Sequence, residues 1–238
     1  MKKIFFKPEN AGAKEFFEPP LPSSKYIPRW YRNSEKYQNG KFDPSLEPPQ
    51  LYGMKYCAPF LDGLTAGYMI TTQYDIFIKN NNNEEVGVYP SFQSDKVANQ
   101  ILQRDLSAYP VPDGFIPIHF LWKYFFTIEL PKGYSALFTH PLNRYDLPFL
   151  TTSGIIDCDD FHSTGTFEFF IKKDFSGLIP KGTPFVQVIP FKRDSWKSEY
   201  DDNDKDIEKH ENFLMKKTLS FMAHDLYRKS FWKPKKYS

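Results

Sequence analysis

Three carboxylates lie within four residues in segment 151–170, which reads TTSGIIDCDDFHSTGTFEFF. Asp157, Asp159 and Asp160 follow the apolar run Gly-Ile-Ile, and the chain then returns to alternating apolar and polar residues. Carboxylates gathered at a turn can hold a divalent ion or supply a general base, and they can equally form a solvated connection between two strands. The pattern therefore predicts a strand, an acidic turn and a second strand, and it leaves both roles of the turn open.

A second polar segment, HPLNR at residues 140–144, precedes the acidic turn in the chain. One interpretation brings Asn143 and Arg144 beside the carboxylates, so that the rim holds a polar ligand or a divalent ion and Asp157 acts as a base. The other interpretation is that Arg144 forms an ion pair with Asp157 or Asp159 and only fixes the loop. Both interpretations place Arg144 next to the acidic turn.

Metal and nucleophile chemistry are not expected. His140 and His162 flank the two polar loops, but the five histidines show neither the HxD nor the HxxxH spacing of zinc and iron ligands. Ser153 lacks the elbow motif of a catalytic serine, and Cys158 lies between acids that raise the pKa of a thiol. Since Cys57 is far away in the sequence, two free thiols are a simpler interpretation than one disulfide. We predict no metal and no cofactor.

The composition is that of a globular, mainly β protein. The 238 residues are 40% hydrophobic, 25% charged and 18% aromatic, with 24 Phe and 15 Tyr that favour strands and bury large areas. The net charge of +2 argues neither for nor against a nucleic-acid partner. The single basic run, KPKK, is expected to be a solvated tail, so a nucleic-acid partner is unexpected. No apolar run reaches the roughly 20 residues of a membrane helix, and the N-terminus lacks the apolar run of a signal peptide. We expect no membrane association and no secretion by a signal peptide.

The distribution of proline and of apolar periodicity predicts three segments. Residues 1–50 contain FFEPPLPSSKYIPRWYRN, which predicts an extended arm that either straps its own body or reaches a neighbouring subunit. Residues 51–195 show alternating runs such as GYMITTQYDIFIKN and predict a β domain. Residues 196–238 predict a long C-terminal helix over 200–229, docked on the β body by an apolar stripe, and a basic tail.

The segment GIIDCDDF at 154–161 also resembles the third motif of the dUTP pyrophosphatases (dUTPases), Gly-Val-Ile-Asp-x-Asp-Tyr-x-Gly. Three further segments resemble the first, second and fourth motifs of this family in the same order: TAGYMI at 65–70, LPKGYSALFTHP at 130–141 and LIPKGTPFVQVIPF at 178–191. The resemblance covers roughly residues 60–193. It implies a small, twisted β clip or barrel that is usually trimeric.

The resemblance to dUTPases implies one catalytic residue and shows where the family's site is altered. Asp157 matches the water-activating carboxylate, and Phe161 lies one residue later than the Tyr that packs on the sugar. Met69 stands where the family has its metal-binding Asp, and HPLNR replaces the phosphate-binding Ser of the second motif. No glycine follows Gly182, so the glycine-rich fifth motif has no counterpart in the sequence. These departures imply that dUTP is not hydrolysed.

A second resemblance is to an uncharacterised protein family found in marine phages and some bacteria. The shared segments are Cys57-Ala58-Pro59, Pro141-Leu142-Asn143-Arg144, Gly154 to Asp159 and Gly182 to Pro190. This resemblance implies a phage protein, located in the host cytoplasm or in the virion, and it implies no particular chemistry.

We therefore expect a mainly β, dUTPase-like phage protein that serves assembly or partner binding, as a virion structural or accessory component. Its expected partners are copies of itself, in a trimer or larger assembly, or other phage proteins. The alternative is a nucleotide- or small-ligand-binding enzyme on a remodelled site, with Asp157 as its catalytic residue. Its ligand-binding residues would be Asn143, Arg144, Asp159 and Phe161.

Overall fold

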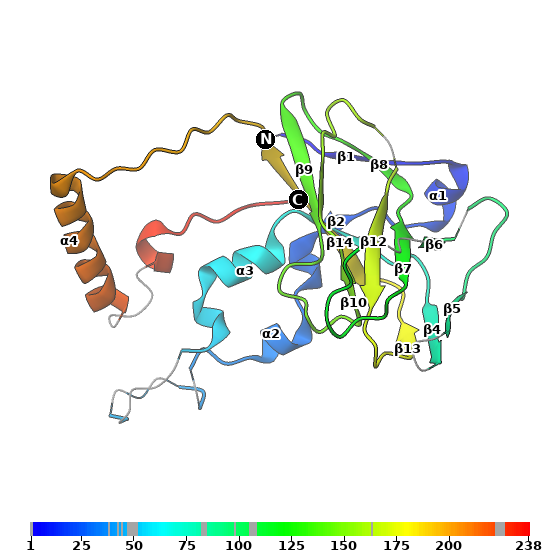
Figure 1. The fold of residues 1–238 in the computed structure, drawn as a ribbon, viewed down its shortest axis with the longest axis horizontal. Helices are drawn as coiled ribbons and strands as arrows, with labels where there is room; N and C mark the ends of the chain where they lie inside the picture. The colour runs from blue at the N-terminus through cyan, green and yellow to red at the C-terminus, as the bar shows by residue number, and fades with distance from the viewer. Residues whose placement is uncertain are drawn as a thin grey trace. The chain divides into compact units, whose positions relative to one another are not determined.

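The structure, a computed structural model, describes residues 2–37, 39–41, 43, 45–46, 52–81, 85–97, 99–104, 109–162, 164–221 and 227–238. The chain divides into two compact units, whose ribbons are drawn in Figure 1. The first, here called the β unit, contains Met1–Ile27, Leu64–Arg193 and Tyr237–Ser238, and the second contains Pro28–Gly63 and Asp194–Lys236. This division differs from the three predicted segments because the first 27 residues belong with the strands.

Strands account for 33% of the structure and helices for 21%, which confirms the prediction of a mainly β protein. The five-stranded sheet has the order β11-β9-β14-β3-β2, with bounds Gly154–Ile156, Tyr134–Thr139, Pro184–Lys192, Tyr68–Thr71 and Leu21–Pro22. The four-stranded sheet has the order β10-β12-β7-β6, with bounds Phe149–Thr151, Thr166–Ile171, His119–Lys123 and Ile101–Arg104. Two smaller sheets are β13-β4-β5 (Gly177–Ile179, Ile76–Asn81, Glu85–Pro90) and β1-β8 (Phe5–Pro8, Phe126–Glu129).

All of these strand pairs are antiparallel, and the described strands form no closed barrel. The barrel form of the predicted fold is therefore not observed. Strands β10 and β11 follow one another in the chain, yet they belong to different sheets. The chain changes sheets between Thr151 and Gly154, which leaves β10 and β11 each at the edge of a sheet.

The core of the β unit is built from aromatic rings that come from both larger sheets. Trp122 of β7 stacks on Phe169 of β12 with ring centroids 3.9 Å apart, and on Phe185 of β14 at 4.7 Å. Phe149 of β10 meets the Trp122 ring edge-on at 5.0 Å. All four side chains are buried. Because aromatic side chains bury large areas, part of the high aromatic content of the sequence serves to hold the two sheets together.

The N-terminal residues form a strap on the β unit of their own chain. Strand β1 pairs with β8, and β2 pairs with β3 at the edge of the five-stranded sheet. Helix α1 (Ala11–Phe16) lies between them and begins after Asn10, whose side chain accepts a hydrogen bond from a backbone N–H in the first turn. Phe17 is buried against the Phe125 ring, with centroids 4.7 Å apart. Residues 5–26, here called the strap, therefore lie on the body of their own chain, which is the first of the two arrangements predicted for the N-terminal arm.

The remaining helical elements are short apart from α4, and most belong to the second unit. Their bounds are η1 Ser23–Tyr26, α2 Arg29–Asn33, η2 Met54–Tyr56, α3 Ala58–Thr65, α4 Asp204–Phe221 and η3 Tyr227–Phe231. Helix α4 lies inside the segment 200–229 that is predicted as helix. Residues 222–226 of that segment lie outside the described residues. The docking of α4 on the β body stays a prediction. Over the described ranges, no helix has both the length and the apolar character needed to cross a membrane.

The buried position of Phe17 predicts that the strap contributes to the stability of the β unit. Phe17→Ala should lower the free energy of unfolding by about 3–5 kcal/mol, the usual cost of removing a buried Phe. Phe5→Ala, which removes an exposed Phe from the same strap, should cost about 0.5 kcal/mol or less. Urea unfolding followed by tryptophan fluorescence measures both. Equal losses for the two variants would contradict the described packing of the strap.

Candidate functional site

The two polar loops lie at opposite ends of strand β9. Strands β9 and β11 are antiparallel, with Gly154 opposite Phe138 and Ile156 opposite Ala136. The acidic turn (residues 157–161) follows β11 and therefore lies beside the start of β9, whereas the loop with Asn143 and Arg144 follows the end of β9. A strand of this length spans roughly 17 Å. The predicted rim that joins the two loops is therefore not formed.

Asp159 is the buried anchor of the acidic turn, and its partner is Arg193, at the end of β14. The Arg193 guanidinium donates to both carboxylate oxygens of Asp159, at 2.8 and 2.5 Å. The Gly133 backbone N–H donates to the same carboxylate at 2.7 Å. The Asp159 side chain is 0% exposed. These donors hold the pKa of Asp159 well below its usual range, with Arg193 as the largest cause, and the carboxylate in turn raises the pKa of Arg193.

The other two carboxylates of the turn also have partners. Asp157 accepts hydrogen bonds from the Ser135 hydroxyl at 2.6 Å and from Arg193 at 3.3 Å, although its side chain is 63% exposed. Asp160 forms an exposed ion pair with Lys132 at 2.7 Å. Among the described residues, no group of three His, Cys, Asp or Glu side chains is placed to hold a metal ion. The turn is therefore organised by cations and hydroxyls of the protein itself.

Two further side chains of the acidic turn differ in exposure. Phe161 is exposed, and its backbone N–H donates to the Asp157 carbonyl at 2.9 Å. Cys158 is buried, and its burial, with a contribution from Asp157 and Asp159, raises the pKa of its thiol to about 11. This agrees with the prediction of an unreactive thiol, and both Cys158 and Cys57 are free.

Arg144 does not pair with the acidic turn, so both predicted arrangements of this residue are wrong. Its guanidinium binds the Asp146 carboxylate through Nε and one terminal nitrogen, each at 2.9 Å. The other terminal nitrogen lies 3.5 Å from the Tyr26 carbonyl oxygen of the strap. The side chain is only 11% exposed. Arg144 thus ties its own loop together and fixes it to the N-terminal segment.

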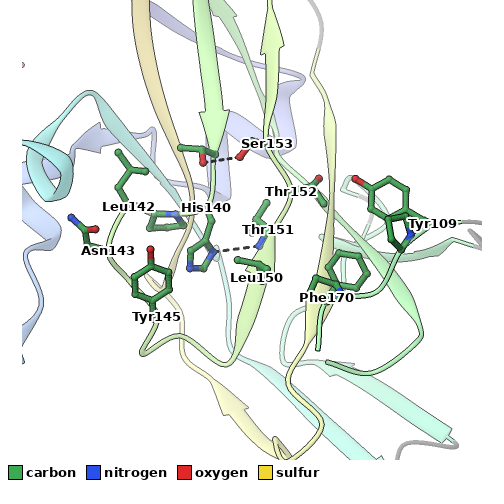
Figure 2. Close-up of a pocket in the computed structure, with 14 residues that line it drawn as sticks. Tyr109, His140, Leu142, Asn143, Tyr145, Leu150, Thr151, Thr152, Ser153 and Phe170 are labelled. Atoms are coloured by element: carbon green, nitrogen blue, oxygen red, sulfur yellow. Dashed lines mark hydrogen bonds between the residues drawn. The ribbon is translucent and has the colours of Figure 1, made fainter. Parts of the chain in front are cut away.

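A pocket of about 440 Å³ lies at the end of β9 that is remote from the acidic turn. Figure 2 shows Asn143 and Tyr145 on one side of it and Tyr109 and Phe170 on the other, with Leu150 between them. Of the predicted site residues, Asn143 alone lines this pocket. It adopts φ 62°, a left-handed conformation that asparagine tolerates better than most residues.

His140 holds the floor of this pocket in place. Its Nδ1 accepts a hydrogen bond from the Thr151 backbone N–H at 3.3 Å, and its Nε2 lies 3.1 Å from the Arg144 carbonyl oxygen. Because the first partner is a donor and the second an acceptor, only the neutral ring with its proton on Nε2 satisfies both. Burial lowers the pKa of His140, which favours the same neutral form.

The most important residue that sequence reasoning missed is Arg193. It lies in the segment FKRD directly after the last long strand, and no motif distinguishes it from the neighbouring Lys192. The aromatic residues of the pocket, Tyr109, Tyr145 and Phe170, are also missed, because they come from three separate segments. A strand order that places β14 next to β9 is the information that would have been needed.

No protein-family model and no curated protein sequence matches this chain. Met69, which stands where the dUTPase resemblance places a metal-binding Asp, is buried in β3 with 1% exposure.

The ion pair between the buried Asp159 and the partly exposed Arg193 predicts that removing the cation alone costs more stability than removing both charges. Arg193→Met should lower the melting temperature by roughly 5–10 °C, because Asp159 then remains buried without its cation. Adding Asp159→Asn should restore part of this loss, because the uncompensated charge is removed. Lys132→Met breaks the exposed pair with Asp160 and should shift the melting temperature by about 2 °C or less. Circular dichroism during heating measures all three, and a double variant less stable than Arg193→Met would contradict the account.

The environment of His140 predicts a loss of stability in mild acid. The folded protein holds a neutral ring with a lowered pKa, whereas the unfolded chain gains a proton below an ordinary pKa of about 6.5. The contribution of His140 to the free energy of unfolding is therefore complete above that pH. At lower pH it decreases by at most about 1.4 kcal/mol per pH unit. His140→Gln can keep both hydrogen bonds without titrating. The free energy of unfolding of the wild type, measured with urea, should exceed that of the variant by less at pH 5 than at pH 7. A difference that stays constant would refute the assignment of a neutral His140 ring.

Proposed function

We propose that this chain is a non-catalytic phage protein that uses a dUTPase-like β scaffold to bind copies of itself or other phage proteins, as a structural or accessory component of the virion. One observation carries the binding role: an exposed apolar row on the three-stranded sheet β13-β4-β5. The phage origin and the dUTPase-like scaffold rest on the resemblances in the sequence.

The apolar row consists of Leu178, Phe77 and Tyr89, which lie directly opposite one another on adjacent strands. They are 52%, 44% and 56% exposed, respectively. On the other face of β4, Ile76 and Ile78 are fully buried. A strand with one buried face usually presents polar side chains to water on its other face. A contiguous row of large apolar side chains there is typical of a surface that contacts another molecule.

Gly87, two residues before Tyr89 on the same strand, leaves room for the Tyr89 ring. A Cβ atom at Gly87 would come within 2.7 Å of the Tyr89 ring, so the ring occupies the space that a side chain at position 87 would take. The absence of a side chain at Gly87 thus extends the apolar surface along β5. This local arrangement supports a role of the row in contact formation.

The partners within the acidic turn support the non-catalytic part of the proposal. Asp157, the residue that matches a water-activating carboxylate, already accepts hydrogen bonds from Ser135 and Arg193. Asp159 and Asp160 are paired with Arg193 and Lys132. An enzyme of this kind instead needs charged groups that are placed to bind the reacting phosphates or a metal ion.

The proposed partner of the apolar row is a second copy of the chain. The dUTPase resemblance implies a cyclic trimer, in which one surface of each subunit meets a different surface of the next. Stable interfaces bury about 800 Å² on each partner, so three side chains form the centre of such a contact rather than the whole of it. Large apolar side chains at the centre of an interface contribute much of the binding energy.

Substitution of the row tests the proposed function. Phe77→Lys should weaken self-association by roughly tenfold or more, because it places a charge at the centre of the contact. Tyr200→Lys, which changes a side chain that is 90% exposed outside the β unit, should have no effect. Sedimentation velocity over a range of concentrations measures association, and circular dichroism verifies folding. A wild-type protein that remains monomeric, or a folded Phe77→Lys variant that associates normally, would overturn the proposal.

A second candidate function, small-ligand binding, is favoured by the position of Asn143 in the pocket at the end of β9. The other residues predicted for a remodelled dUTPase-like site do not line this pocket. The structure therefore supports ligand binding at a different place from the acidic turn.

A further inference from the structure

The lining of the pocket at the end of β9 is uncharged and combines apolar side chains with hydroxyl groups. Of the described residues that form it, none is Asp, Glu, Lys or Arg, and several carry hydroxyl groups: Tyr109, Thr139, Tyr145, Thr152 and Ser153. His140 is held as the neutral ring by its two hydrogen bonds. A ligand with a phosphate or carboxylate group would therefore find no counterion in the lining, whereas an uncharged ligand fits its chemistry.

Charged side chains beside the pocket make contacts within the protein. The Glu168 carboxylate accepts a hydrogen bond from the Thr152 hydroxyl of the lining at 3.3 Å. Lys172 donates to the Tyr145 backbone carbonyl at 2.8 Å. Arg144 is bound by both oxygens of Asp146. The contacts of these two cations hold the loop that carries Asn143 and Tyr145, so the cations position the pocket wall instead of facing a ligand.

The hydroxyl groups of the lining can adapt to a partner that is both donor and acceptor. The Thr139 and Ser153 hydroxyls lie 2.8 Å apart and share one hydrogen bond, in which either is the donor (Figure 2). Whichever hydroxyl accepts keeps its own hydrogen for another partner. Asn143 adds an amide with both donor and acceptor atoms. This set matches a ligand rich in hydroxyl groups, which have the same dual character.

Aromatic rings flank the hydroxyl groups on both sides of the pocket. Tyr145 is 77% exposed and Tyr109 is 44% exposed, and Figure 2 shows them at opposite sides of Leu150. An exposed tyrosine presents an apolar ring face with a polar tip. A sugar ring has C–H groups that can pack on such a face and hydroxyl groups around its rim.

We propose that this pocket binds an uncharged sugar ring, through packing on Tyr145 and hydrogen bonds to Asn143 and the Thr139–Ser153 hydroxyl pair. The volume of about 440 Å³ accommodates one or two such rings. This site is separate from the acidic turn and from the apolar row, so it does not depend on the proposed role in assembly.

Saturation-transfer NMR on the full chain tests the proposal with glucose, galactose, mannose and N-acetylglucosamine as probes, and with the uncharged nucleoside uridine as the competing chemistry. At least one sugar should show transfer from the protein. Tyr145→Ala should weaken its binding by about tenfold, whereas Tyr145→Phe, which keeps the ring face, should retain most of it. Because Tyr145 is largely exposed, both variants should fold, which circular dichroism verifies.

Tyr200→Ala provides the matched control, because it removes a tyrosine that is 90% exposed, lies outside the β unit and belongs to neither the pocket nor the apolar row. It should bind the sugar as the wild type does. Three results would overturn the proposal: no sugar of the panel binds, sugar binding is unchanged in folded Tyr145→Ala, or uridine binds in a Tyr145-dependent way while the sugars do not.

Discussion

The ion pair between Arg193 and Asp159 joins strands that are not neighbours in the five-stranded sheet. Asp159 follows β11 and Arg193 follows β14, while β9 lies between these strands. Both backbone groups of Gly133, the residue directly before β9, also contribute. The Gly133 N–H donates to the Asp159 carboxylate, and the Gly133 carbonyl accepts from the backbone N–H of Arg193. A buried carboxylate is costly unless cations and N–H donors surround it. Asp159 therefore constrains three strand ends at once.

The acidic turn lies apart from the two surfaces that we propose for binding. The acidic turn is engaged at one end of β9, whereas the uncharged pocket lies at the other end and is shaped by Arg144, Asp146 and His140. The apolar row lies at a third place, the exposed face of the sheet β13-β4-β5. The carboxylates that resemble catalytic groups in the sequence thus make contacts within the folded chain, and the two surfaces proposed for binding lie elsewhere.

Local pattern predicted much of the β architecture but little of the site. Alternating residues predicted the strands around the acidic turn, because period two is a local property of a half-buried strand. The partner of Asp159 could not be predicted, since Arg193 reaches it only through the strand order β11-β9-β14. The pairing of Arg144 with Asp146, two residues away, differs from the prediction because the three clustered carboxylates of the acidic turn have the pattern of a site and a single Asp does not. Proline and aromatic residues indicated an extended N-terminal segment, but not that Phe17 would enter the core.

The central claim is that the acidic turn stabilises the fold and does not perform catalysis. Its most direct test is an assay of pyrophosphate release from dUTP with magnesium, comparing the wild type with Asp157→Ala. The account predicts no release above the uncatalysed rate from either protein, because the buried Met69 provides no metal ligand and the described residues contain no group of three His, Cys, Asp or Glu placed to hold a metal ion. Magnesium-dependent release by the wild type that is lost in a folded Asp157→Ala variant would contradict it.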